Sequence, residues 1–446
     1  MAGQTKDMTT GSSTKLILTF GLPLLAGNIL QQLYNMVDTI VVGRGVGVDA
    51  LAAVGATGSI NFLVLGFIMG MAQGVSILVA QFFGSGDMRR LRQSIIMRGY
   101  ISIAVCLLMT IISVAFTRSI LVLMDTPEAI LTDAVNYIRI IFLGMSVSYA
   151  YNFFSGILRA VGDSKNPVIA MVIACVINIV LDVFLVMGVH MGVEGAALAT
   201  VIAQAFSAVY CVVSYLKIDE TRVQRDDWQM NFGLLKESFV LSLPVAIMNS
   251  ITAVGVMVLQ VGVNHFGTQH IAAYSAGSKI MTVLETVGMT FGFACSTFVG
   301  QNLGAGKIDR ILKGVNETAL VMAILHIVLG VVMILTTKPI LTMMIGSSQP
   351  EVIEYGCQYM RILYIFLFVL SILWVYRCSL QSLGDTVLPM VSGFVEFFAR
   401  IVFTLTLPKL IGFDGIAYAE ISAWVGACCV LIPAFYYRIR QKKELI

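Results

Sequence analysis

The sequence predicts an all-α polytopic membrane protein with twelve transmembrane helices in two six-helix lobes. Three observations carry this prediction. Hydrophobic residues make up 58% of the 446 residues and charged residues only 12%, twelve long apolar segments follow one another, and the second half of the chain repeats the first. Soluble domains contain about 25% charged residues, so this composition excludes an ordinary soluble protein. A net charge of +3 gives no indication of nucleic-acid binding.

Each apolar segment is near or above the roughly 20 residues that a helix needs to cross a bilayer. We expect helices over residues 16–42, 51–80, 94–116, 131–156, 166–188, 192–216, 237–263, 271–300, 314–336, 353–380, 387–408 and 414–437. No segment requires a strand. The polar first residues, 1–15, lack the apolar core of a signal peptide, so we expect the first helix to remain in the protein.

Lysine and arginine gather on one side of the predicted membrane. That side holds, among others, Arg89, Arg90, Arg92, Arg98, Arg159, Arg377 and Arg438, whereas the other side holds Arg44, Arg118, Lys338 and Lys409. Cytoplasmic loops carry the excess of basic residues in membrane proteins. We therefore expect a multi-pass protein of the cell (inner) membrane with both termini in the cytoplasm.

The chain contains an internal repeat with an offset of about 220 residues. The matching pairs include Pro23 with Pro244, QFFGSGD from Gln81 with QNLGAGK from Gln301, and LRAVGDSKNP from Leu158 with LQSLGDTVLP from Leu380. Each half holds six predicted spans, so both halves insert with the same polarity. We expect lobes at residues 1–216 and 237–446, joined by a cytoplasmic linker at 217–236 and related by a pseudo-two-fold axis along the membrane normal.

Four polar residues form a stripe along the first predicted helix. Asn28, Gln31, Asn35 and Asp38 are spaced three, four and three residues apart, which puts them on one helix face. A carboxylate that faces lipid is costly, so this face should point into the protein or a watery cavity. The stripe indicates either a functional site or a neutral, hydrogen-bonded Asp that braces neighbouring helices.

A second intramembrane acid lies at a similar depth. Counted from the predicted outer ends of their helices, Asp38, Asp182 and Thr200 lie within a few Å of one level at about 1.5 Å per residue, and Asn178 lies ~6 Å deeper. Two carboxylates, an amide and a hydroxyl would make an all-oxygen site that suits Na⁺, Mg²⁺ or Ca²⁺. It also suits a proton, because two close carboxylates cannot both stay ionised easily. The alternative is a structural hydrogen-bonded cluster.

Several of these segments resemble one family. YNMVDTIVVGRGVGVDALAAVG, LVAQFFGSGD, ILRAVGDSKNP, and NIVLD followed by GAALAT are similar to the multidrug and toxic compound extrusion (MATE) family over about residues 14–437. The resemblance implies twelve helices in two lobes and cation-coupled export of drugs. In the branch that looks closest, an N-terminal-lobe cation site falls on Asp38, Asn178, Asp182 and Thr200. Na⁺ or H⁺ would be the coupling ion, and no other cofactor is expected.

The second half departs from this pattern. Another branch of the family has acids midway along the seventh and tenth helices, where this chain has only Glu237 and Glu354 near the helix starts. The repeat places Leu259, Arg400, Thr404 and Glu420 on the positions of Asp38, Asn178, Asp182 and Thr200. We expect Arg400 to form an internal ion pair with Glu420 or Glu396, because an unpaired buried charge is costly. The sequence leaves the role of Glu285 open.

We expect the substrate to bind in a cavity between the lobes. Its candidate lining residues are Gln31, Tyr34, Asn35, Asn249, Gln260 and Tyr376. The predicted protein is not an enzyme, because no HExxH, GxSxG or aspartate-rich pattern is present. The resemblance implies a secondary active antiporter that exports amphipathic, often cationic compounds by alternating access. Its expected partners are small-molecule drugs and the lipid bilayer, without nucleic acid, and we expect a monomer.

A lipid-linked oligosaccharide flippase of the wider superfamily is the alternative function. Such a protein needs a cationic cavity for pyrophosphate. Only Arg139, Lys279, Arg361 and Arg400 remain for the helices after the loop charges are assigned, which disfavours this alternative. The eight cysteines form no CxxC pair and lie mostly in apolar runs, which favours packing over disulfides or a metal site.

Overall fold

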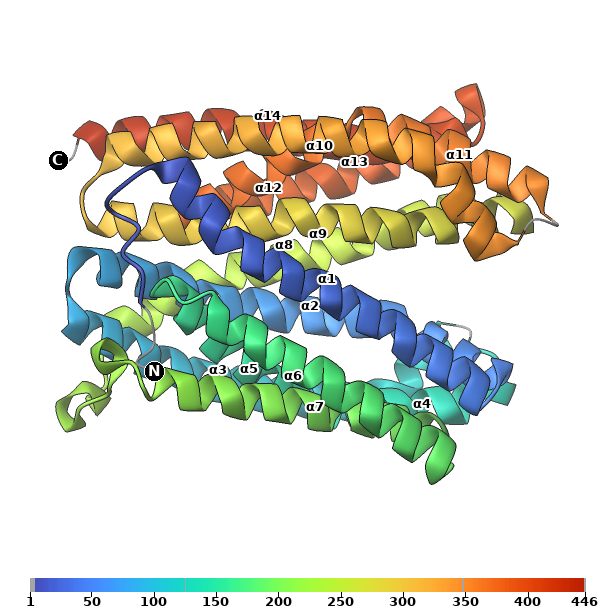
Figure 1. Cartoon of the computed structure of the whole chain (residues 1–446), viewed down its shortest axis with the longest axis horizontal. Coiled ribbons are helices and arrows are strands. Elements are labelled where there is room, and N and C mark those ends of the chain that lie inside the picture. Colours follow the sequence, from blue (N-terminus) through green and yellow to red (C-terminus); the bar gives the residue numbers. More distant parts are fainter. Residues whose placement is uncertain (1–4, 125, 347–348, 445–446) are drawn as a thin grey trace. The chain divides into compact units, whose positions relative to one another are not determined.

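The computed structural model describes residues 5–124, 126–346 and 349–444. Helices account for the regular secondary structure of these residues, and no strand occurs among them. The first half contains α1 (Ser13–Gly45), α2 (Val48–Ser85), α3 (Met88–Leu123), α4 (Glu128–Leu143), α5 (Met145–Ala160), α6 (Lys165–Asp182), η1 (Val183–Gly188) and α7 (Gly192–Tyr215). The short helices η2 (Asp219–Thr221) and η3 (Arg225–Trp228) follow (Figure 1).

The second half continues with α8 (Phe232–Asn264), α9 (Thr268–Gly304), α10 (Ile308–Ile345), α11 (Pro350–Ile365), α12 (Leu367–Ser382), α13 (Val387–Ile411) and α14 (Asp414–Glu444). Ten of the described helices are long and apolar enough to cross a membrane, and the two bent pairs α4–α5 and α11–α12 bring the number of spans to as many as twelve. The prediction of an all-α polytopic membrane protein is confirmed.

The chain divides into two compact units. Unit 1 comprises residues 1–8 and 22–246, and unit 2 comprises residues 9–21 and 247–446. The first helix of each half, α1 or α8, therefore contributes residues to both units. Pro23 and Pro244 lie within two or three residues of the points where the assignment changes. A proline inside a helix removes a backbone hydrogen bond, which makes these points natural bends.

Two predicted spans are broken in the middle. The spans expected over 131–156 and 353–380 are helix pairs that bend by 43° between α4 and α5 and by 50° between α11 and α12. The first bend lies at Gly144, where a Cβ atom would come within 2.7 Å of Val201 Cγ1 on α7. Glycine is thus required for the close approach of α7. The second bend lies at Phe366, at the matching place in the repeat.

The loop motifs of the repeat form the same turn twice. Gly162 and Gly384 both have φ +87°, a left-handed conformation that glycine adopts without a steric cost. Asp163 then accepts backbone hydrogen bonds of 3.0 and 3.1 Å from the first residues of α6, and Asp385 accepts two of 3.1 Å from the first residues of α13. The Gly-Asp pair therefore ends one helix and caps the next in each half.

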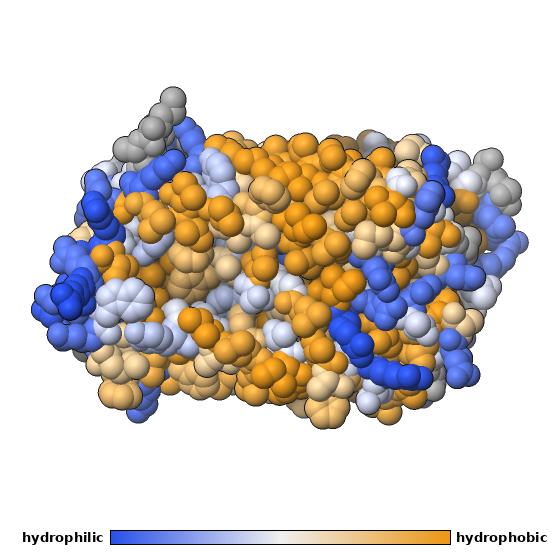
Figure 2. All heavy atoms as spheres, turned by 90° about the horizontal axis from the view of Figure 1, so that it is seen from below, coloured by the Kyte–Doolittle hydropathy of each residue, from blue (hydrophilic) through white to orange (hydrophobic). Residues whose placement is uncertain are grey.

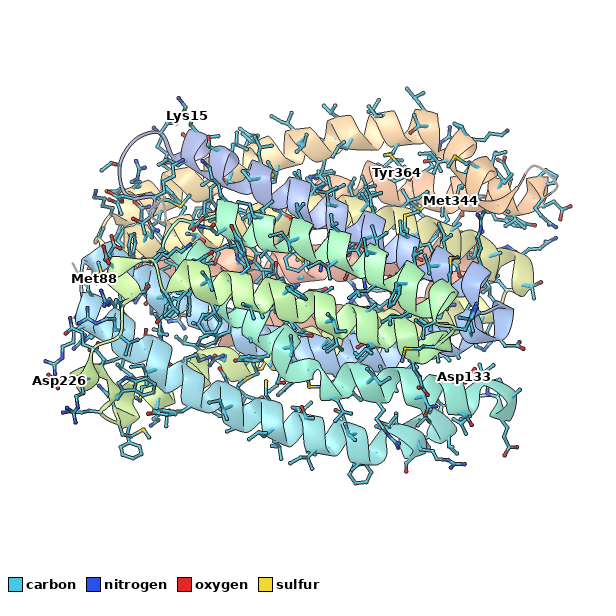
Figure 3. All side chains as sticks on the ribbon, turned by 60° about the horizontal axis from the view of Figure 1, so that its bottom comes forward. Lys15, Met88, Asp133, Asp226, Met344 and Tyr364 are labelled. Carbon is cyan, nitrogen blue, oxygen red and sulfur yellow. The ribbon has the colours of Figure 1, made fainter. Side chains whose placement is uncertain are left out.

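Apolar side chains fill the interior of unit 1 and also cover much of the outer surface. Ile138, Phe142 and Ile157 are fully buried, whereas Leu123 and Met343 are 84% and 90% exposed. Figure 2 shows hydrophobic side chains over most of the visible face and hydrophilic ones toward its ends. In unit 1, Met88 and Asp226 lie at one end of the helices and Asp133 at the other (Figure 3). This surface suits a bilayer as solvent.

Three basic residues that the sequence analysis assigned to the cytoplasmic connections lie within helices instead. Arg98 in α3 is 1% exposed, and its Nη1 donates a 2.9 Å hydrogen bond to the carbonyl oxygen of Ser238. Arg159 in α5 donates to Ser155 Oγ at 2.9 Å. Arg377 in α12 is 3% exposed. That assignment was wrong for these three, because each side chain turns into the protein and finds a hydrogen-bond acceptor there.

Candidate functional site

Unit 1 brings the four predicted cation-site residues together in two pairs. Asp38 lies on α1, Asn178 and Asp182 lie on α6, and Thr200 lies on α7, which packs beside α6 (Figure 1). The carboxyl groups of Asp38 and Asp182 lie close enough to interact electrostatically. Asn178 Nδ2 donates to Thr200 Oγ1 at 3.4 Å. Helices distant in sequence thus place two acids, an amide and a hydroxyl in one region.

Four oxygen atoms of this group lack hydrogen-bond donors among the described residues. Asp182 and Asn178 are 0% and 1% exposed. No group in the described part of the chain donates a hydrogen bond to either carboxylate oxygen of Asp182, to Asn178 Oδ1 or to Asp38 Oδ1. Buried polar atoms are nearly always satisfied, so four unsatisfied acceptors in one place require an explanation. Protons or a bound cation would supply what these oxygens lack.

The helix that carries both Asn178 and Asp182 changes its geometry directly after the acid. The span expected to be continuous over 166–188 is α-helical only to Asp182 and becomes a π-helix over Val183–Gly188. The Val189 amide, at the end of that segment, donates to Phe184 O at 2.8 Å. π-Helical turns occur frequently at functional sites, because the wider turn re-aims side chains. The sequence carried no clear signal for this change.

Two tyrosines complete the surroundings of the acids. Tyr34 on α1 and Tyr137 on α4 both lie close enough to interact electrostatically with Asp38 and Asp182. The sequence analysis assigned Tyr34 to a substrate cavity and gave Tyr137 no role. A signal for Tyr137 was present in the repeat, because YIRI from Tyr137 returns as YMRI from Tyr359.

The donor set of this region fits a hard cation or a proton. No group of three or more His, Cys, Asp and Glu side chains in the described residues is arranged to hold a metal ion. A cation here would instead be held by two carboxylates together with neutral oxygens of Asn178 and Thr200. Oxygen-only ligands select hard cations such as Na⁺ and disfavour transition metals.

Unit 2 carries an ion-pair network in the corresponding helices. Arg400 on α13 donates from Nε and Nη2 to the two carboxylate oxygens of Glu420 on α14, at 2.9 Å each. Trp424 Nε1 donates to Glu420 Oε1 at 3.1 Å. A bidentate, charge-assisted pair of this kind fixes both side chains.

A second pair adjoins the first. Glu396 lies 3.6 Å from Arg400 Nη2 and also pairs with Arg377 Nη2 on α12, which in turn contacts Ser392 Oγ at 3.3 Å. Arg377, Glu396 and Arg400 are only 2–3% exposed. Two arginines and two glutamates balance in charge, which is the condition for burying ions at an acceptable cost. The sequence analysis expected Arg400 to pair with Glu420 or Glu396 and missed the pair of Glu396 with Arg377.

Two glycines of α8 make room for α13, and one of them, Gly255, faces the network. A Cβ atom on Gly255 would lie 3.1 Å from Arg400 Nη1 and 3.3 Å from Arg400 Cδ, and one on Gly262 would clash with Thr404 Cγ2. In the repeat, Gly255 occupies the position of Tyr34. Unit 1 thus has an aromatic ring where unit 2 has space for a guanidinium.

Glu285 lies near the network but outside its pairs. It is half-buried on α9 and interacts electrostatically with Glu420, Arg400 and Glu396. Glu285 adds a fifth ionisable group beside a network whose other four groups already balance. Its role stays open.

The six residues predicted to line a substrate cavity fall in different units. Gln31, Tyr34 and Asn35 lie on α1 in unit 1, and Asn249, Gln260 and Tyr376 lie in unit 2. Two of them have partners within unit 2. Tyr376 is 7% exposed and donates to Asn316 Oδ1 at 3.1 Å, and Gln260 donates to Asn264 at 2.9 Å. The cavity itself stays a prediction.

Comparison with known proteins gives one family. The model of the family described as MatE matches residues 23–184 and again residues 244–406. The two matches have nearly equal length and begin at the paired Pro23 and Pro244. They therefore coincide with the internal repeat found in the sequence.

Similar proteins cover the chain from end to end. The "Probable multidrug resistance protein YpnP" of Bacillus subtilis is 26% identical over 98% of this chain and 98% of that protein. The "Probable multidrug resistance protein YoeA" of the same organism is 28% identical over 96% of this chain and 94% of that protein. A structure described as the "Outward-facing conformation of a multidrug resistance MATE family transporter of the MOP superfamily" superposes with a TM-score of 0.91, at 19% identity and covering 100% of each chain. That structural likeness shows the fold.

Proposed function

This chain belongs to the MatE family, and we propose that it exports amphipathic, often cationic small molecules across the cell membrane in exchange for Na⁺ or H⁺. Relatives named as multidrug resistance proteins support the substrate class. Basic residues near helix ends, such as Arg89 and Arg90 at the start of α3 and Arg438 near the end of α14, support an orientation with both termini in the cytoplasm.

We propose that Asp38, Asn178, Asp182 and Thr200 form the coupling site. The observation that carries this proposal is the set of buried acceptor oxygens without donors on three of these residues. Two adjacent carboxylates repel each other when both are ionised, so a cation or proton between them relieves the repulsion. Release of that ion to the cytoplasm would change the charge of unit 1 and bias it toward another conformation.

Alternating access follows from this charge change. A transporter exchanges ion and substrate when each binds one conformation better than the other. The ion neutralises the acid pair, whereas a cationic substrate could neutralise it instead. The ion and the cationic substrate would then compete for the negative charge of Asp38 and Asp182. This competition would couple substrate export to ion entry, and the two would never be bound at the same time. The lipid-linked oligosaccharide flippase is disfavoured further, since Arg400, one of the four basic residues left for the helices, is already bound to Glu420.

The proposal is tested in proteoliposomes that contain the purified protein. Ethidium transport is measured under a Na⁺ gradient alone and then under a pH gradient alone, for the wild type and for Asp38→Asn and Asp182→Asn. Asp133→Asn is the matched control, because Asp133 is an exposed acid at the other end of α4 from the bend. Transport driven by neither gradient, or driven equally well in the two site variants, would overturn the proposed coupling site.

A further inference from the structure

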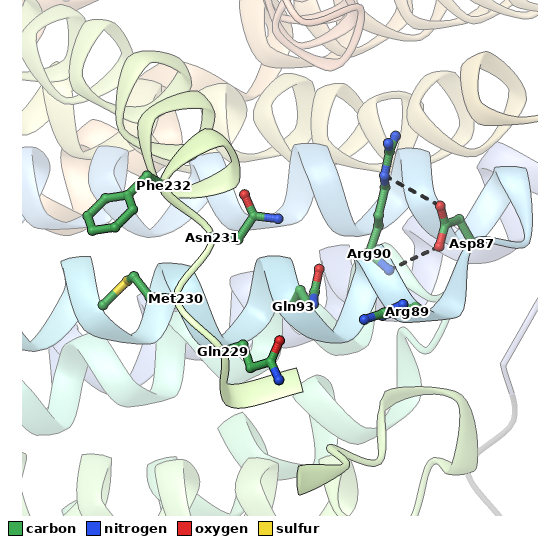
Figure 4. Close-up of a pocket in the computed structure, with 8 residues that line it drawn as sticks. All are labelled: Asp87, Arg89, Arg90, Gln93, Gln229, Met230, Asn231 and Phe232. Carbon is green, nitrogen blue, oxygen red and sulfur yellow. Dashed lines mark hydrogen bonds and ion pairs between the residues drawn. The ribbon is translucent and has the colours of Figure 1, made fainter. Parts of the chain in front are cut away.

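A cavity of about 490 Å³ lies at one end of unit 1, away from the candidate coupling site. Its walls are the start of α3 and the segment that leads from η3 into α8 (Figure 4). The predicted spans of these two helices begin at residues 94 and 237, directly beyond the cavity. It therefore lies at the level where the lipid headgroups meet the protein.

The cavity has fixed walls. Arg92 Nε on α3 donates a 2.6 Å hydrogen bond to Asp227 Oδ2 on η3, and both side chains are largely buried. The Asn231 amide donates to Met97 Sδ at 3.3 Å. These contacts hold the connecting segment against α3, so the space between them is built into the fold.

Two polar side chains of the cavity have no hydrogen-bond or ion-pair partner among the described residues. Gln93 is 9% exposed, yet its side-chain amide has no hydrogen-bond partner among the described residues. Arg89 is exposed and has no ion-pair partner in the described part of the chain. Figure 4 shows Gln93 between Arg90 on one side and Gln229 and Asn231 on the other. An amide without a protein partner, on a residue that is only 9% exposed, lies beside an exposed guanidinium without an ion pair, and together they can bind a ligand that accepts hydrogen bonds.

The cavity also contains one acid with spare capacity. Asp87 Oδ1 caps α3 by accepting from the Arg90 amide at 3.0 Å. Its Oδ2 forms an ion pair with Arg90 Nε at 3.7 Å, a distance too long for a hydrogen bond, so this oxygen can still accept one. Asp87 could thus accept a hydrogen bond from a ligand cation while Arg89 binds a ligand anion.

Exposed apolar side chains flank these polar groups. Trp228, Met230 and Phe232 are 57%, 52% and 73% exposed. The Trp228 ring packs edge-on against Tyr100 of α3, with ring centroids 6.5 Å apart. Aromatic residues gather at the membrane interface, where one part of the side chain meets acyl chains and another meets headgroups. A ligand in this cavity would therefore have lipid tails beside it.

We propose that this cavity binds the headgroup of a zwitterionic phospholipid that carries a phosphate and a primary ammonium, as in phosphatidylethanolamine. Arg89 and the Gln93 amide bind the phosphate oxygens. Asp87 Oδ2 accepts a hydrogen bond from the ammonium group. Trp228, Met230 and Phe232 lie along the acyl chains. The site is separate from the coupling site, so the proposal does not depend on the transport function.

The charge pattern distinguishes this lipid from others. Phosphatidylglycerol has the phosphate but offers no cation to Asp87. Phosphatidylcholine has a quaternary ammonium that cannot donate a hydrogen bond. A purely basic cavity would favour the anionic phosphatidylglycerol. Asp87 in this cavity disfavours that lipid.

The test uses the full-length protein in detergent and native mass spectrometry with dioleoyl-phosphatidylethanolamine, -phosphatidylglycerol and -phosphatidylcholine. We expect the first lipid to bind about tenfold more tightly than the other two, and Arg89→Ala to weaken its binding about tenfold, the order of magnitude of one lost charge-assisted contact. Arg222→Ala, an exposed arginine of the same connection outside the cavity, should bind as the wild type does.

Asp87→Asn provides the sharper variant. Asparagine caps a helix as well as aspartate does, so α3 should keep its start while the negative charge is lost. The preference for phosphatidylethanolamine over phosphatidylcholine should then disappear. A preference that survives in Asp87→Asn, or tighter binding of phosphatidylglycerol than of phosphatidylethanolamine, would overturn the proposal.

Two soluble probes separate a lipid site from a phosphate site. Glycerophosphoethanolamine and inorganic phosphate are added as competitors to the lipid-bound protein. We expect neither to displace the lipid at equal concentration, because neither has acyl chains to pack beside Trp228 and Phe232. Displacement by inorganic phosphate at equal concentration would show a free-anion site and would overturn the lipid proposal.

Discussion

Arg400 donates two hydrogen bonds of 2.9 Å to the carboxylate of Glu420. In the repeat, these two residues stand on the positions of Asn178 and Thr200, which form a 3.4 Å hydrogen bond in unit 1. The same pair of helix positions is thus neutral in one unit and ionic in the other. The guanidinium stays charged in proteins, so it acts as a permanently tethered cation.

Breaking the pair of Arg400 and Glu420 should lower the stability of the fold and leave the coupling of ion and substrate transport intact. We expect Glu420→Gln to lower the folding yield and the melting temperature, by the equivalent of ~3–5 kcal/mol, because Arg377 and Arg400 then share Glu396 alone and one buried positive charge is uncompensated. Arg400→Glu combined with Glu420→Arg should recover part of the loss. Asp309→Asn is the control, since it breaks the exposed pair with Lys443 and should cost about 1 kcal/mol or less. Full yield with lost transport in Glu420→Gln would place Glu420 in the transport site instead.

The space at Gly255 gives an independent test of the same network. Gly255→Ala adds a methyl group 3.1 Å from Arg400 Nη1, so the guanidinium must shift from its partners. We expect a loss of about 1–3 kcal/mol in stability, seen as a lower melting temperature.

The control for Gly255→Ala is Gly99→Ala. A Cβ atom on Gly99 would meet nothing within 4 Å, so alanine should only add its higher helix propensity there, about 1 kcal/mol. Equal melting temperatures for the two variants would show that the network tolerates displacement of Arg400.

The fold was predictable from the sequence because hydrophobic length and the repeat act over many residues. Details that depend on the direction of one side chain were not. The predicted spans 94–116 and 353–380 already contained Arg98 and Arg377, yet a basic residue near a helix end suits a loop equally well. Only packing shows that Arg377 turns inward to Glu396.

The sequence predicted which residues belong to the candidate site, but it did not predict their local geometry. Helix periodicity and depth brought Asp38, Asp182 and Thr200 to one level, whereas the π-helical turn after Asp182 has no signature in the hydrophobic pattern. Tyr137 could have been found from the repeat, because its counterpart Tyr359 interacts electrostatically with Glu420 and Arg400 in unit 2. Equivalent tyrosines beside equivalent sites are a stronger signal than either residue alone.

Neutralising either acid of the candidate site should abolish coupling and spare folding. We expect Asp38→Asn and Asp182→Asn each to lower ion-driven ethidium export at least ~100-fold, because an amide cannot bind a proton and holds Na⁺ weakly. Melting temperatures should stay at or above the wild-type value, since an uncompensated buried carboxylate is removed. Near wild-type export by well-expressed Asp38→Asn would refute the site.

Access to the polar face of α1 should change during the cycle. Asn35 is exposed and lies one turn before Asp38, so a cysteine there reports on the path to the acid pair. The cysteine is introduced into a variant without the eight native cysteines. We expect the rate at which a thiol reagent labels Asn35→Cys from the outside to differ at least ~5-fold between two conditions: Na⁺ or low pH, and saturating substrate. The reason is that ion and substrate favour different conformations. Asn35→Cys with Asp38→Asn should lose the ion response while retaining a substrate response. Labelling that is identical in all conditions, in a protein that still transports, would rule out alternating access at this face.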